Sequence, residues 1–149
     1  FWWAIRADKV GETGRLTTIL LRRPPKFSNP SARSVALVSA AKRWDTSTYG
    51  VYAAQKEAIR ALSRGAACEW GSMGIRTNCI LPLAKSPALE MWAQWRPEEA
   101  AAFEQTVPMK RLGHCENDIG EFVALLCAPE SRYVNGQSIA IDGGQVNMG

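Results

Sequence analysis

Three residues of this sequence can carry acid–base chemistry: Ser39, Tyr52 and Lys56. Tyr52 and Lys56 are four positions apart, so a helix would project the phenol and the ammonium group in one direction. A free phenol has a pKa of about 10 and is a poor base at neutral pH, but a cation within about 4–6 Å favours the phenolate. The Ser39 hydroxyl can hold a substrate carbonyl oxygen beside the phenol and stabilise its developing charge.

The elements that must position these residues follow from the hydrophobic pattern. Residues 34–39 form a short apolar run of strand length, typical of a strand buried in a parallel sheet, with Ser39 at its end. Residues 49–70 carry small residues at three- and four-residue intervals and are followed by glycines, which predicts a helix containing Tyr52 and Lys56. The alternative interpretation is that Tyr52 and Lys56 are an ordinary helical pair and that Ser39 only ends a strand.

Strand and helix patterns continue to alternate along the chain. We predict a second strand over residues 76–81, which Pro82 ends. We predict helices over residues 87–95, 97–106 and 117–127 and a third strand over residues 137–141. This order predicts an α/β fold, the second half of a doubly wound, Rossmann-like parallel sheet of about three strands with flanking helices and right-handed connections.

In order and spacing, these landmarks resemble the short-chain dehydrogenase/reductase family. In that family a hydrophobic strand ends in the catalytic serine, and Tyr-x-x-x-Lys opens the following long helix, as the segment from Ser39 to Lys56 does here. Residues 74–82 (GIRTNCILP) resemble the next strand, which leads into the loop beside the nicotinamide. Residues 133–144 (YVNGQSIAIDGG) resemble the closing strand and its Asp-Gly-Gly. The resemblance extends over residues 34–144.

The resemblance implies an NAD- or NADP-dependent oxidoreductase that interconverts a secondary alcohol and a ketone. Tyr52 would exchange the hydroxyl proton, Lys56 would favour its phenolate and hold the nicotinamide ribose, and Ser39 would orient the substrate oxygen. The resemblance assigns further cofactor contacts to the loop that contains Pro82, Leu83 and Ser86.

Two positions depart from the family pattern. Leu83 stands where the family usually has a glycine, at a point where the backbone comes close to the nicotinamide. Glu12 stands at the expected distance for the asparagine that links the lysine to water in the family. We therefore do not expect a proton relay through an asparagine.

The start of the chain differs from the remainder. Residues 1–43 have a net charge of +7, from nine Lys/Arg and two Asp/Glu, whereas residues 44–149 have a net charge of −3, from nine and twelve. We interpret residues 1–33 as an irregular basic segment and residues 34–149 as the catalytic-end portion of a Rossmann-like domain. Gly11 and Gly14 have neither the spacing nor the preceding strand of a Gly-rich pyrophosphate turn. We therefore expect a truncated chain that binds NAD(P) weakly or not at all.

Composition narrows the class of protein. The chain has 149 residues, of which 46% are hydrophobic and 21% charged, as expected of one globular domain. No apolar run approaches the roughly 18 residues that span a bilayer, and no signal peptide is recognisable, so we expect a cytoplasmic protein without a membrane partner. The four cysteines form no C-x-x-C pair and there is one histidine, so no metal site is predicted. The basic segment lacks aromatic–basic interleaving, and we expect no nucleic-acid partner.

Partners and an alternative function follow from the same patterns. The helices of residues 87–106 are rich in apolar and aromatic residues, which suits a hydrophobic alcohol or ketone or simple packing on the sheet. The small-residue face of the helix over residues 49–70 suits a partner helix, and the resemblance implies a homo-oligomer. The alternative is a non-catalytic fragment that keeps the helices of the family as an association module.

Overall fold

The structure is a computed structural model that describes residues 33–37 and 50–146, with side chains from residue 50 onward. Its elements, in chain order, are β1 (Arg33–Leu37), α1 (Gly50–Trp70), η1 (Gly71–Met73), β2 (Arg76–Pro82), α2 (Pro87–Trp95), α3 (Pro97–Thr106), η2 (Cys115–Gly120), α4 (Glu121–Cys127), η3 (Pro129–Ser131) and β3 (Ser138–Ile141). The segment η2 is a π-helical turn that leads directly into α4. This alternation of strands and helices confirms the predicted α/β class.

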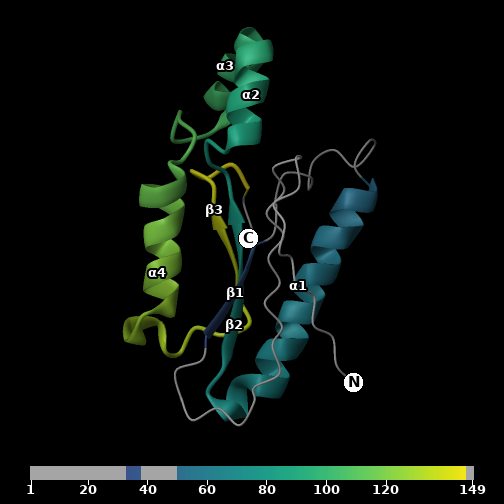
Figure 1. Cartoon of the computed structure of the whole chain (residues 1–149), viewed down its shortest axis with the longest axis vertical. Helices are drawn as coiled ribbons and strands as arrows, with labels where there is room; N and C mark the ends of the chain where they lie inside the picture. Colours follow the sequence, from purple (N-terminus) through teal and green to yellow (C-terminus); the bar gives the residue numbers. More distant parts are fainter. Residues whose placement is uncertain (1–32, 38–49, 147–149) are drawn as a thin grey trace.

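Three parallel strands form the described sheet, in the order β1-β2-β3. β2 lies in the middle, with Arg33 opposite Arg76 on one side and Cys79 opposite Ser138 on the other. Its five central residues are buried, and three of them, Cys79, Ile80 and Leu81, are apolar, as expected of a strand covered on both faces. α1 covers one face of the sheet and α4 covers the other (Figure 1). The predicted doubly wound sheet of three strands with flanking helices is therefore confirmed.

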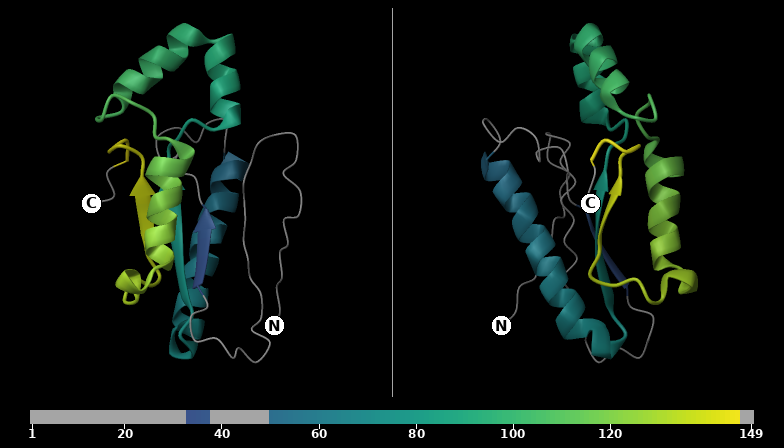
Figure 2. Two further views of the ribbon diagram at one scale, coloured as in Figure 1. Left: turned by 60° about the vertical axis from the view of Figure 1, so that its left-hand side comes forward. Right: turned by 180° about the vertical axis from the view of Figure 1, so that it is seen from behind.

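The two strand connections have opposite hands. The chain moves across the sheet in one direction, from β1 through β2 to β3, yet α1 and α4 lie on opposite faces. In the left-hand view of Figure 2, α4 lies in front of the sheet and β3 lies to the left of β2, so this connection is left-handed. The prediction of right-handed connections is wrong here. The rule describes a strand that feeds its crossover helix directly, whereas residues 83–120 intervene before α4.

Two asparagines join the start of β2 to its neighbours. The Asn135 side chain accepts a hydrogen bond from the Thr77 backbone N–H (2.8 Å) and donates one to the Ala67 carbonyl near the end of α1 (3.0 Å). Asn78 is 2% exposed. Its side-chain amide donates a hydrogen bond to the Val134 carbonyl and accepts one from the Gln137 N–H, both at 3.0 Å. These bonds pair buried backbone groups where the strand ladder stops. They fix the position of α1 relative to β2 and β3.

An apolar cluster fills the space between β2 and α4. Ile80, Ile119 and Leu126 form its buried centre, and Phe122, Val123 and Ile139 are among the residues that pack around it. Ile80 is fully buried, and Leu126 is 4% exposed. Burial of such side chains contributes roughly 1.5–3 kcal/mol each to folding. This cluster anchors α4 and the preceding π-helical turn to the sheet.

The helices α2 and α3 form a hairpin that stands beyond the end of the sheet (Figure 1). Neither helix contains a buried residue, and both begin with proline, which suits the first helical position. The rings of Trp92 and Phe103 hold the hairpin together in an edge-to-face contact, with centroids 6.0 Å apart. Met91 and Trp95 are exposed, at 49% and 79%. The hairpin therefore presents apolar side chains at its surface.

We predict that Asn135→Ala destabilises the fold by about 1–3 kcal/mol, because it leaves the buried N–H of Thr77 without its acceptor. Chemical denaturation followed by circular dichroism would measure the loss. Gln94→Ala is the matched control, since it removes a similar amide from an exposed position of α2. Equal stability of the Asn135→Ala variant and the wild type would contradict the structural role given to Asn135.

Candidate functional site

The first two turns of α1 hold the proton-transfer pair proposed from the sequence. The Lys56 Nζ lies 5.3 Å from the centroid of the Tyr52 ring, so the cation faces the aromatic side chain. Lys56 is 6% exposed, whereas Tyr52 is half-buried. α1 begins at the end of the sheet toward which the strands point (Figure 1). In open α/β sheets, ligands bind at this carboxyl end of the strands.

Ser39, the third predicted catalytic residue, lies outside the described residues, and its assignment stays a prediction. The structure brings Tyr52 and Lys56 together on one helix face, as their spacing required. Their catalytic roles are likewise predictions that rest on this geometry.

The end of β2 and the loop that follows it contain three of the predicted cofactor contacts, Pro82, Leu83 and Ser86. Pro82 is the last residue of β2, opposite Ile141. The Leu83 N–H donates to the Ile141 carbonyl (2.9 Å), so the loop leaves the sheet in contact with β3. The Ser86 hydroxyl accepts a hydrogen bond from the Leu89 N–H (3.3 Å) and caps α2. Ser86 therefore has a structural role, and its predicted contact with a cofactor remains untested.

A salt bridge that the sequence did not predict lies beside this loop. Arg111 donates to both carboxylate oxygens of Asp118, at 2.6 and 2.8 Å, and the His114 N–H donates to the same carboxylate at 2.6 Å. The Arg111 guanidinium and then the His114 N–H stabilise the charged carboxylate, which holds the pKa of Asp118 well below its usual range. A spacing of seven residues without helical or strand periodicity gave no signal for this pair.

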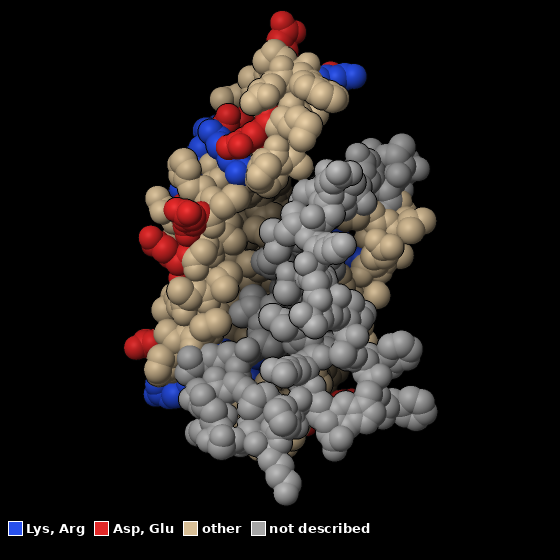
Figure 3. All heavy atoms as spheres, in the orientation of Figure 1, with Lys and Arg blue, Asp and Glu red and all other residues tan. Residues whose placement is uncertain are grey.

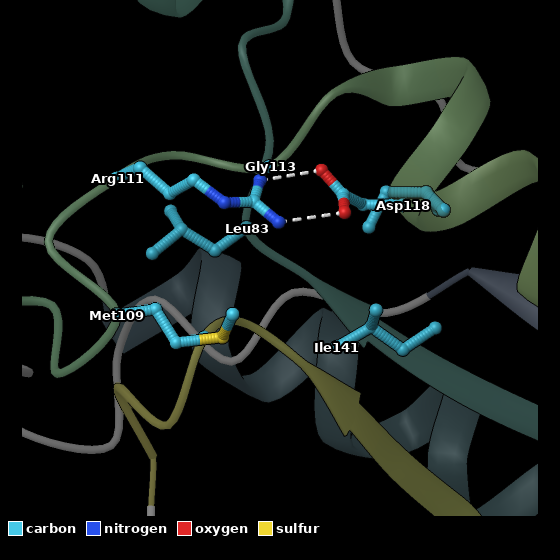
Figure 4. Close-up of a pocket in the computed structure, with 8 residues that line it drawn as sticks. Leu83, Met109, Arg111, Gly113, Asp118 and Ile141 are labelled. Carbon is cyan, nitrogen blue, oxygen red and sulfur yellow. Dashed lines mark hydrogen bonds and ion pairs between the residues drawn. The ribbon is translucent and has the colours of Figure 1, made fainter.

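A cavity of about 140 Å³ lies next to this salt bridge (Figure 4). Arg111 and Asp118 face each other along one side, and Leu83, Met109 and Ile141 line the other. Both terminal nitrogens of Arg111 bond to Asp118, which neutralises its charge. The cavity therefore offers apolar side chains and a neutralised ion pair rather than a free charge.

The Asp-Gly-Gly segment after β3 forms a tight turn. The buried Asp142 carboxylate accepts hydrogen bonds from the backbone N–H groups of Gly144 (3.0 Å) and Val146 (2.8 Å). Gly143 has φ of 65°, and a Cβ there would lie 2.9 Å from the Val107 side chain. Its carbonyl accepts from the Met109 N–H (3.2 Å). The turn requires glycine and fixes the chain where it returns from α3.

Residues 50–146 contain no cluster of histidine, cysteine and acidic residues that could hold a metal ion, and none of their helices is long and apolar enough to cross a membrane. Cys79 is 1% exposed, and burial raises the pKa of its thiol, so it lies in the core as a neutral thiol. On the face seen in Figure 3, acidic and basic side chains of the described residues are interspersed.

Comparison with known proteins places this geometry in a family. A family profile described as enoyl-(acyl carrier protein) reductase matches residues 17–145. A 12α-hydroxysteroid dehydrogenase from Clostridium is 42% identical over 93 residues, which are 62% of this chain and 36% of that protein. Senescence-associated protein 13 from Arabidopsis thaliana is 35% identical over 83% of this chain and 45% of its own length.

Solved structures agree with this placement. Levodione reductase is 34% identical with a TM-score of 0.65, over 74% of this chain and 45% of that one. A short-chain dehydrogenase/reductase of the glucose/ribitol dehydrogenase type from Brucella melitensis is 26% identical with a TM-score of 0.67, over 78% and 46%.

The chain belongs to the short-chain dehydrogenase/reductase family, since the family profile covers most of its length. It spans less than half the length of the Clostridium and Arabidopsis relatives. Its similarity to a dehydrogenase and a reductase makes it an oxidoreductase by resemblance. The predicted family resemblance is confirmed.

We predict that Asp118 stays ionised at pH values at which ordinary carboxylates are protonated. Because its pKa is lowered in the folded chain, its bonds to Arg111 and His114 remain as pH falls through about 4, the ordinary value for Asp, and are lost only in stronger acid. An NMR titration that follows the Asp118 carboxyl carbon would measure the midpoint. Arg111→Gln should move this midpoint up toward about 3.9. An identical midpoint in that variant would contradict the assigned cause.

Proposed function

We propose that this chain is the catalytic-end portion of an NAD(P)-dependent oxidoreductase that interconverts a secondary alcohol and a ketone. The observation that carries the proposal is the buried Lys56 ammonium beside the Tyr52 ring, at the carboxyl end of a parallel sheet. A positioned tyrosine hydroxyl can serve as a general acid or base. Tyr52 can then accept the proton of an alcohol or return it to the oxygen of a reduced ketone.

The other residues would orient the reactants. Ser39 would hold the substrate oxygen, and Lys56 would also donate to the hydroxyl groups of the nicotinamide ribose. A nicotinamide cofactor, when bound, supplies the hydride chemistry that amino-acid side chains lack. The described residues fit its nicotinamide end, because the Lys56 ammonium and the loop of Pro82, Leu83 and Ser86 lie at the carboxyl end of the sheet.

For the substrate, we propose a bulky, mainly apolar ketone. Met91 and Trp95 are exposed on the hairpin of α2 and α3, at the end of the sheet where Tyr52 lies. Contact with an apolar molecule would remove these side chains from water, at roughly 25 cal/mol per Å² of buried surface. The names of a 42% identical hydroxysteroid dehydrogenase and a 39% identical tropinone reductase homologue point to ring-containing ketones.

The alternative is a non-catalytic association module, and the outer face of α1 favours it. Val51 and Leu62 are exposed there, at 78% and 48%. Exposed apolar side chains on one helix suit a second copy of the chain. A homo-oligomer is compatible with either function, so cofactor binding is the better discriminator.

Removal of the Tyr52 hydroxyl tests the catalytic assignment. In assays with ring-containing ketones and NADH or NADPH, Tyr52→Phe should lower kcat by about 10²–10⁴, because it removes the transferable proton and little volume. The matched control is Tyr133→Phe, since Tyr133 is 99% exposed and remote from Lys56. Retention of more than about a tenth of the wild-type rate in Tyr52→Phe would refute the assigned role.

Cofactor titration separates the two functions. The chain should bind NADH or NADPH weakly but saturably, with a dissociation constant above the low micromolar range, because it lacks a Gly-rich phosphate turn. Lys56→Met should abolish this binding, whereas Arg132→Met, which removes an exposed positive charge outside the cofactor loop, should not. Tryptophan fluorescence would follow the titration. Equal binding by the Lys56→Met variant and the wild type would favour the association module.

A further inference from the structure

The hairpin of α2 and α3 joins the sheet through a closed neck. Ala84 and Gly113 form a parallel bridge, the Lys85 N–H donates to the Gly113 carbonyl (2.9 Å), and the Gly113 N–H donates to the Leu83 carbonyl (3.2 Å). The chain therefore leaves and returns to the sheet at one point. Both backbone groups of Leu83 are bonded, because its carbonyl accepts from the Gly113 N–H and its own N–H donates to the Ile141 carbonyl.

Gly113 is the centre of this neck. A Cβ at this position would lie 3.0 Å from the Leu83 carbonyl oxygen and 3.5 Å from the Asp118 side chain. The first of these neighbours is backbone that is itself hydrogen-bonded, so it cannot easily move. The close approach of the two segments thus depends on the absence of a side chain at residue 113.

The Asp118 carboxylate holds the chain on both sides of Gly113. It bonds to the Arg111 guanidinium two residues before and to the His114 N–H directly after. Asp118 itself is fixed to the body of the protein, because it lies in the π-helical turn η2 whose Ile119 belongs to the apolar core. Charge-assisted bidentate pairs combine strength with a defined geometry. The carboxylate therefore connects the neck to α4.

We propose that Asp118 is a positioning residue, which holds Gly113 against Leu83 and so fixes the backbone of Leu83 at the end of β2. The consequence for turnover rests on the proposed function, in which this loop lies beside the cofactor and the hairpin covers the substrate. We call the bonds from Asp118 to Arg111 and His114 the clamp. The clamp is a property of the fold and can be measured without any substrate.

Hydrogen exchange of single amides, followed by NMR in the full chain, tests the clamp. Asp118→Asn keeps the shape of the side chain but loses its charge, and exchange at the Lys85 and Gly113 amides should become about tenfold faster, the equivalent of 1.4 kcal/mol. Asp118→Ala should show a larger effect, because it also removes the acceptor for His114. The matched control is Glu116→Gln, an exposed acid of the same turn whose side chain makes no hydrogen bond or ion pair among the described residues.

A double-mutant cycle separates the clamp from general destabilisation. Arg111→Gln should accelerate the same amides, and adding Asp118→Asn to it should have little further effect, because both changes break one pair. Amides in the centre of β2 should keep their exchange rates in every variant. Unchanged exchange at the neck, or a uniform rise throughout the chain, would overturn the proposal.

Steady-state kinetics show whether the Asp118 bonds serve the site. Asp118→Asn and Arg111→Gln should both raise KM for the ketone at least fivefold with little change in kcat, because Tyr52 and Lys56 are untouched. Faster exchange with unaltered kinetics would overturn the positioning role. A complete lack of turnover in all variants and in the wild type would refute the proposed function instead, and the exchange experiment would still decide the clamp.

Discussion

The burial of β2 between two parallel neighbours is the constraint on which the rest of this structure depends. A strand paired on both edges and covered on both faces must satisfy its backbone within the sheet and present apolar side chains to both layers, and β2 does so. At both ends of β2, groups outside the strand ladder bond to the backbone of the chain. Asn78 and Asn135 bond to the backbone at its start, and Ile141 and Gly113 bond to the backbone of Leu83 beyond its end. One strand therefore determines where the loops at both ends of the sheet can lie.

The sequence predicted what depends on local signals within one segment. The strand over residues 76–81 and the helices over residues 87–95 and 97–106 were expected within a residue of their observed bounds, because prolines mark the end of the strand and the start of each helix. Contacts between segments leave no such signal. Arg111 and Asp118 meet because the chain folds back on itself, and the hand of the β2–β3 connection depends on residues that intervene before α4.

The polar side chains of the described residues fall into two groups. Asn135, Asp142 and Asp118 bond to backbone N–H groups and hold turns in place. Lys56 is different, because its buried ammonium faces an aromatic ring at the open end of the sheet. Family motifs led to Tyr52 and Lys56 directly, since the chemistry limits the choice of residue. The supporting residues were harder to find, because many side chains can serve as acceptors for an N–H.

The closed neck between Ala84 and Gly113 has a consequence for how such a protein can evolve. Because the two ends of the hairpin already meet, the sheet pairs in the same way whatever length of chain lies between them. Each doubling of a flexible loop costs only about 0.6 kcal/mol of closure entropy. The helices between these residues can therefore change in length and sequence without disturbing the strands or the Tyr52–Lys56 pair. A common scaffold can in this way acquire new specificities without redesign of its core.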